Sequence, residues 1–76
     1  MNYPRIILKR GRDASLRHGH PWLFSGAIAA KEGDPAPGDI VLAADAAGRP
    51  LALGFYNNGD IAFRLVSDDP GARIDA

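Results

Sequence analysis

The residues with the most chemistry to offer lie close together near the start of this 76-residue chain. His18 and His20 form an H-x-H pair that could bind a metal ion, and Trp22 and Phe24 follow them directly. Two imidazoles are too few ligands for a stable metal site, and the chain has no cysteine to complete one. We therefore expect no metal, with His18 exposed at a helix end and His20 in a turn, packed beside Trp22.

Groups that could form an active site are scarce. The glycine-rich patterns GxGxxG and GxxxxGK[ST], which hold cofactor phosphates, do not occur. The serines form no Ser-His-Asp arrangement with a nucleophile elbow. Most carboxylates stand beside glycine or proline, where turn hydrogen bonds and solvation explain them. We expect no active site within this chain.

Basic side chains are concentrated at one end of the sequence. The formal net charge is +0, yet residues 1–24 contain five Lys and Arg against one acid, and residues 25–76 contain four against eight. Such an asymmetry permits a polyanion-binding surface, because each phosphate contact releases condensed counterions. A solvated, solubilising face explains the same charges, and composition alone does not decide between the two. The residues concerned are Lys9, Arg10, Arg12 and Arg17.

The aromatic residues allow two interpretations as well. Trp22 and Phe24 could stack on nucleobases. A chain this small has few large apolar side chains with which to fill a core, so we expect both residues to bury their rings as a lid on the core. The same interpretation applies to Phe55, whereas Tyr56, on the opposite face of its strand, is left as a possible contact.

The elements that position these residues are mostly β-strands. Residues 12–19 predict a short helix that Asp13 or a neighbour caps, that Leu16 anchors to the core and that Gly19 ends in a left-handed conformation. Glycine and proline mark the loop at residues 32–39, and Gly48 suits a tight turn. The predicted strands lie within residues 3–11, 25–33, 39–45, 51–57 and 61–67. The pattern indicates a mainly β domain with short helices, folded as a small barrel or curled sheet.

Length and composition indicate one small globular domain. Its hydrophobic fraction of 46% and charged fraction of 24% are ordinary for such a domain. The absence of cysteine, and therefore of disulfide bonds, favours a location in the reducing cytoplasm. No apolar run approaches the roughly 20 residues that span a bilayer, so we expect no membrane association.

Three motifs resemble the N-terminal PUA domain of the bacterial class I S-adenosylmethionine-dependent methyltransferases that act on cytosine C5 of large-subunit ribosomal RNA. PUA is an RNA-binding module named after pseudouridine synthases and archaeosine transglycosylases. The most specific motif is H-P-W-L-F-S-G at residues 20–26. P-G-D-I-V at residues 37–41 and G-x-x-x-A-x-G-x-Y-N at residues 48–57 support it.

The resemblance implies a PUA-like pseudo-barrel of about five to six mixed strands over residues 1–70. It implies that residues 71–76 are a linker toward a catalytic domain outside this chain. S-adenosylmethionine and the catalytic cysteine of the family would belong to that domain, so no cofactor is expected here.

The resemblance also implies a function and a surface for it. In PUA domains the first helix, the glycine-containing loop after it and a neighbouring strand contact RNA. The resemblance therefore favours the interpretation of the basic residues as a contact surface for ribosomal RNA over their interpretation as a solvated face. The alternative is a structural domain that packs against its own catalytic domain or a partner subunit, with little RNA contact. An exposed apolar patch at Trp22 or Tyr56 would favour that alternative. The RNA-binding residues implied are Lys9, Arg10, Arg12, Arg17, Gly19 and His20.

Overall fold

The computed structural model describes residues 3–67, 69 and 71. The expected linker at residues 71–76 therefore lies, except for Gly71, outside the described residues. Strands dominate the described part, as predicted. In chain order the elements are β1 (Arg5–Leu8), α1 (Ala14–Arg17), β2 (Trp22–Phe24), the 3-10 turn η1 (Ser25–Ala27), β3 (Ile28–Glu32), β4 (Ile40–Ala44), β5 (Pro50–Tyr56) and β6 (Ile61–Ser67).

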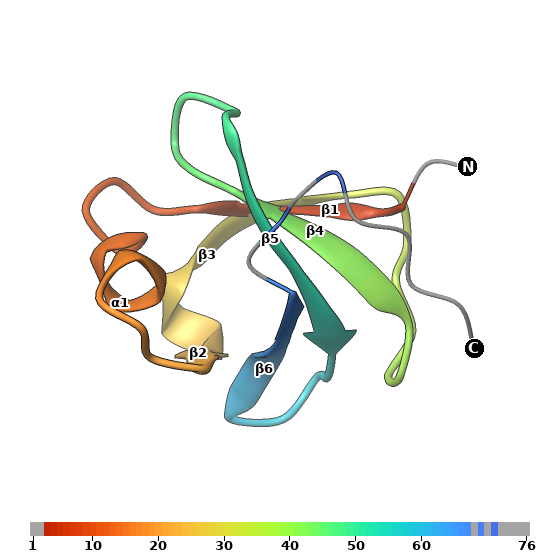
Figure 1. The fold of residues 1–76 in the computed structure, drawn as a ribbon. Helices are drawn as coiled ribbons and strands as arrows, with labels where there is room; N and C mark the ends of the chain where they lie inside the picture. Colours follow the sequence, from red (N-terminus) through yellow and green to blue (C-terminus); the bar gives the residue numbers. More distant parts are fainter. Residues whose placement is uncertain (1–2, 68, 70, 72–76) are drawn as a thin grey trace.

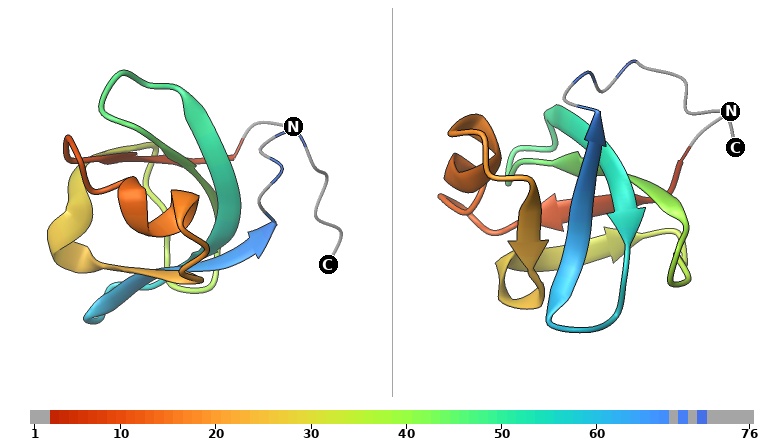
Figure 2. Two further views of the ribbon diagram at one scale, coloured as in Figure 1. Left: turned by 60° about the vertical axis from the view of Figure 1, so that its left-hand side comes forward. Right: turned by 60° about the horizontal axis from the view of Figure 1, so that its bottom comes forward.

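The strands form one curled, mixed sheet of six strands in the order β2-β6-β5-β4-β1-β3 (Figure 1). β1 pairs with β4 in parallel, and the other neighbours described pair antiparallel. The sheet curls round on itself like an incomplete barrel (Figure 2). Its edge strands, β2 and β3, are joined by η1. This is the mixed-strand architecture that the resemblance implied.

The concave side of the sheet encloses the core. Its largest fully buried side chains come from five different strands, so the core ties the whole sheet together. Truncating a buried ring such as that of Phe63 to alanine typically costs about 3–5 kcal/mol. The six largest are Phe63, Ile6, Leu8, Leu23, Leu53 and Val41.

The faces of β5 differ from the prediction. Tyr56 is buried at 6% exposure, whereas Phe55 is 45% exposed, so the assignment of Phe55 to the core is wrong. Alternation correctly separates the two side chains, but it does not say on which side of the strand the core lies. A register shift between Leu53 and Gly54 also buries Leu53 together with Ala52, which strict alternation does not allow.

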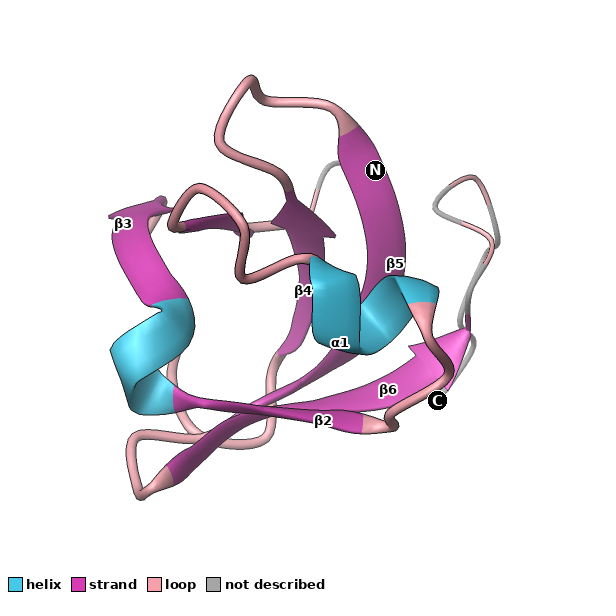
Figure 3. Ribbon diagram, turned by 90° about the vertical axis from the view of Figure 1, so that its left-hand side faces the viewer, coloured by secondary structure: helices cyan, strands magenta, loops and turns pink. Residues whose placement is uncertain are grey.

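Helix α1 is a single turn that lies across the open side of the sheet, above β2 in the view of Figure 3. Leu16 packs against the core cluster, as predicted. Gly19 has the expected positive φ of 89° and follows the helix end. Asp13 occupies the N-cap position without a side-chain capping hydrogen bond, because its carboxylate accepts one from Arg17 instead.

Candidate nucleic-acid interface

Three of the predicted cations lie on one tight turn after β1, here called the basic loop (residues 9–12). The backbone N–H of Arg12 donates to the carbonyl of Lys9 at 2.9 Å, and Gly11 between them has a φ of 84°. A positive φ at the third position of a four-residue turn is typical of type II, which explains the glycine. The N–H of Lys9 donates to the carbonyl of Ala27 at 2.8 Å and fixes the loop to η1.

The charges of the basic loop are not neutralised within the described part of the chain. Lys9, Arg10 and Arg12 are all exposed. No carboxylate of a described residue lies within ion-pair distance of their side chains. Three cations within four residues, held on an ordered backbone, can contact successive phosphates.

Arg17 lies in a different electrostatic environment. Its Nε lies 2.5 Å from Asp13 Oδ2 and its Nη2 lies 3.6 Å from Asp45 Oδ2, in the β4–β5 turn. The hydrogen bond from Arg17 lowers the pKa of Asp13 below its ordinary value of 3.8, and the same bond raises the pKa of Arg17. Two carboxylates thus offset the guanidinium, so the basic loop is the stronger centre of positive charge.

The other two predicted contact residues, Gly19 and His20, follow the end of α1, next to His18. His18 is the exposed C-cap residue. Gly19 is exposed, and the N–H of His20 donates to the carbonyl of Ser15 at 2.9 Å. His20 is exposed and lines the same pocket as Trp22. Within residues 3–67, 69 and 71 no group of three or more metal-ligating side chains occurs.

Trp22 and Phe24 do not cover the core. They are 42% and 60% exposed, so their interpretation as a buried lid is wrong. Leu23 between them is the side chain of β2 that points inward, at 2% exposure. In a strand the neighbours of a buried residue face outward, and the core is filled from the other strands. Because the rings are exposed, they could stack on nucleobases, which is the other interpretation of these two residues.

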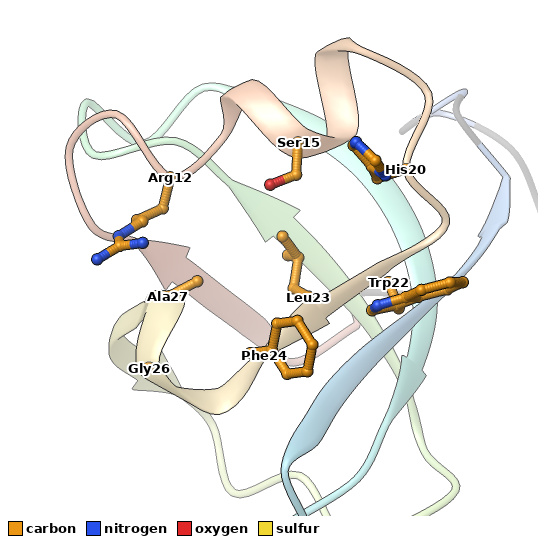
Figure 4. A pocket seen from close by; sticks show the side chains of 8 residues that line it. All are labelled: Arg12, Ser15, His20, Trp22, Leu23, Phe24, Gly26 and Ala27. Atoms are coloured by element: carbon orange, nitrogen blue, oxygen red, sulfur yellow. The ribbon is translucent and has the colours of Figure 1, made fainter.

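A pocket of about 340 Å³ lies between α1, β2 and η1, here called the aromatic pocket (Figure 4). The view shows Arg12 and His20 on opposite sides of it, with Trp22 and Phe24 along the lower margin. Arg12 therefore connects the basic loop with an aromatic surface. The residues that line it are Arg12, Ser15, His20, Trp22, Leu23, Phe24, Gly26 and Ala27.

One arrangement escaped prediction from the sequence. Arg64 of β6 pairs with Trp22 of β2 on one side and with Phe55 of β5 on the other. Cross-strand partners project from the same face of a sheet, and all three residues are exposed. The outward position of Arg64 was predictable from alternation, but the strand order that brings the two rings beside it was not.

Neither the length nor the hydrophobicity of any helix in the described part of the chain suffices to span a membrane.

Comparison with known proteins places the chain in a family. Residues 6–68 match the family described as PUA-like domain. The chain is 45% identical over 56 residues to Ribosomal RNA large subunit methyltransferase I of Salmonella arizonae, covering 74% of the chain and 14% of that protein. It is 37% identical over 75 residues to the protein of that name from Klebsiella pneumoniae, covering 97% and 19%. For an Escherichia coli protein of that name the identity is 40% over 72 residues, covering 93% and 18%.

The chain thus spans less than a fifth of the length of these relatives. The family match, in contrast, extends from within β1 to the end of β6, over nearly the whole curled sheet and both sides of the aromatic pocket. The chain belongs to the family of PUA-like domains.

Proposed function

We propose that this chain is the RNA-binding module of an rRNA methyltransferase and helps to position the enzyme on ribosomal RNA. The observation that carries the proposal is the basic loop: Lys9, Arg10 and Arg12 are exposed on one ordered turn, without a carboxylate partner among the described residues. Phosphate contacts supply affinity and orientation, while sequence choice comes from elsewhere. The names of the relatives supply the class of RNA, that of the large ribosomal subunit.

The proposal includes a catalytic partner. The parent enzyme transfers a methyl group from S-adenosylmethionine to cytosine C5 in the cytoplasm, and residues 71–76 link the RNA-binding domain, residues 1–70, to the domain that does so. The described residues do not fit the cofactor themselves. Their helix α1 has one turn, and the chain lacks the glycine-rich strand–helix turn that holds nucleotide cofactors. The chain's own role is therefore binding, with no chemical step.

Charge reversal on the basic loop tests the proposal. The double variant Arg10→Glu, Arg12→Glu should bind a structured fragment of large-subunit rRNA about tenfold or more weakly than the unchanged chain at low salt. Because fewer counterions are released, the slope of log affinity against log salt should also become shallower. Fluorescence anisotropy with labelled RNA measures both.

A matched variant shows whether position matters or only net charge. Lys31→Glu changes a cation on β3 whose amine already donates to the Tyr56 hydroxyl at 3.1 Å and lies 5.5 Å from its ring centroid. It should cost much less affinity per charge than the double variant. Equal losses per charge, in variants whose melting curves show intact folds, would contradict a phosphate site at the basic loop.

A second candidate function is docking onto the catalytic domain or a partner subunit. The exposure of Trp22, Phe55 and Val66 favours it, because apolar surface of this kind is common at interfaces. Under this alternative, Arg10→Glu, Arg12→Glu would leave methylation by the full-length enzyme nearly intact. Under the RNA-binding proposal the same variant lowers methylation, and added salt weakens it further.

A further inference from the structure

The large apolar side chains that the described structure exposes are all on three neighbouring strands. They are Trp22 and Phe24 of β2, Phe55 of β5 and Val66 of β6, each at least 40% exposed. β6 lies between β2 and β5 in the sheet. The convex face of this half of the sheet therefore presents rings to solvent, while its concave face holds Leu23 and Phe63 in the core.

Two of these aromatic residues flank a basic residue in the sheet. Arg64 is the direct cross-strand partner of both Trp22 and Phe55, so the three side chains form a row across β2, β6 and β5. Adjacent strands lie about 4.8 Å apart, which places the two ring-bearing positions roughly 10 Å from each other. We call this row the stacking row (Trp22, Arg64 and Phe55).

The charge around the stacking row favours a polyanionic ligand. No described carboxylate lies within ion-pair distance of Arg64. At the other end of the row, Trp22 also lines the aromatic pocket, which Arg12 of the basic loop borders. The row is thus connected to the basic loop through the aromatic pocket. A purely apolar partner would bury Arg64 without compensation, which is costly, whereas nucleic acid offers it phosphate oxygens.

We infer that the stacking row binds an unpaired stretch of RNA, with bases stacked on Trp22 and Phe55 and Arg64 between them. This inference rests on the proposed function and adds the class of RNA segment: single-stranded rather than helical. Every base has a π-face, so stacking on aromatic side chains holds single strands with little sequence preference. Bases in a duplex are already stacked on each other and cannot reach the row.

The experiment replaces the ring of Phe55, which stands at the end of the row opposite Trp22 and does not line the aromatic pocket that Arg12 borders. Phe55→Leu keeps apolar bulk and removes the ring, and Phe55→Tyr keeps the ring. Affinity for a single-stranded RNA oligonucleotide should fall about fivefold or more in Phe55→Leu and return to near the original value in Phe55→Tyr. Affinity for an RNA duplex of the same length should be equal in all three proteins.

Trp22 supplies an independent signal, because it is the single tryptophan of the chain. The single strand should quench its fluorescence, whereas the duplex and inorganic polyphosphate should not. Unquenched Trp22 fluorescence and equal affinity of Phe55→Leu for the single strand would overturn the inference, even where RNA still binds in a salt-dependent way. If Trp22 fluorescence changes when the catalytic domain is attached but does not change when RNA is added, the inference is overturned and the surface is a protein-docking site. If neither the single-stranded RNA nor the RNA duplex binds, the proposed function itself is contradicted, and this result differs from those that overturn only the inference.

Discussion

Arg17 Nη2 lies 3.6 Å from Asp45 Oδ2, so helix α1 is joined to the turn between β4 and β5. Asp13, the N-cap residue of α1, forms a second ion pair with the same guanidinium. Arg17 is therefore a structural tie between distant parts of the chain as well as a cation near the proposed RNA surface. The side chains of the basic loop form no ion pair with a described residue, so they differ from Arg17 in being available for a ligand.

Removing the charge of Asp13 should strengthen RNA binding. In Asp13→Asn the Arg17 guanidinium loses its nearer carboxylate partner and becomes available to a phosphate. We expect affinity at low salt to rise a few fold, and the salt slope to steepen by up to about 0.9 if one further phosphate is contacted. Anisotropy titrations at several salt concentrations measure both. Asp34→Asn, an equal charge change in the loop before β4, serves as the control. An equal gain in both variants would show that only net charge matters.

The same pair predicts a pH dependence of stability. The Arg17 hydrogen bond lowers the pKa of Asp13 in the folded state, so the pair stabilises the fold fully above the unfolded value of 3.8. That contribution is lost as the pH falls through the lowered folded pKa. Asp13→Asn should therefore melt below the unchanged chain near neutral pH, and the difference should close in acid. A difference in melting temperature that stays constant from neutral pH into strong acid would contradict this assignment.

Gly54 of β5 is required for the approach of β6. A Cβ at this position would overlap the carbonyl oxygen of Arg64 and lie 2.6 Å from Phe63 Cζ. Because one neighbour is backbone and the other is a fully buried ring, Gly54→Ala should cost about 1–3 kcal/mol or more. Gly26→Ala is the matched control, since nothing lies within 4 Å of its added Cβ. Urea unfolding compares the two, and equal stabilities would mean that β5 and β6 are not packed as described.

Local chemistry made the turns and strands predictable. Gly19 and Gly48 have φ angles of 89° and 86°, and glycine tolerates such values where other residues rarely do. Five of the six described strands correspond to predicted ranges, whereas β2 (Trp22–Phe24) was not predicted. The predicted helix segment contains α1, although α1 is shorter than expected. These features depend on a few neighbouring residues, so the sequence displays them directly.

The outward face could not be predicted, because it depends on the strand order. Alternation shows that Trp22 and Phe24 share a face and that Phe55 opposes Tyr56, but the side of the core is a property of the whole sheet. The placement of Arg64 between two rings requires β6 to lie between β2 and β5. The pairing of Arg17 with Asp45 likewise joins elements that are remote in sequence.

The central claim is that the basic loop and the end of α1 form the RNA-binding surface, and backbone NMR on the 76-residue chain tests it most directly. Titration with a structured rRNA fragment at low salt should shift the amide signals of residues 9–20 and leave those of β3 (Ile28–Glu32) nearly unchanged. Added salt should reverse the shifts, since phosphate contacts supply the affinity. If the amides of residues 9–20 stay unmoved at low salt while the fold is intact, the claim is contradicted.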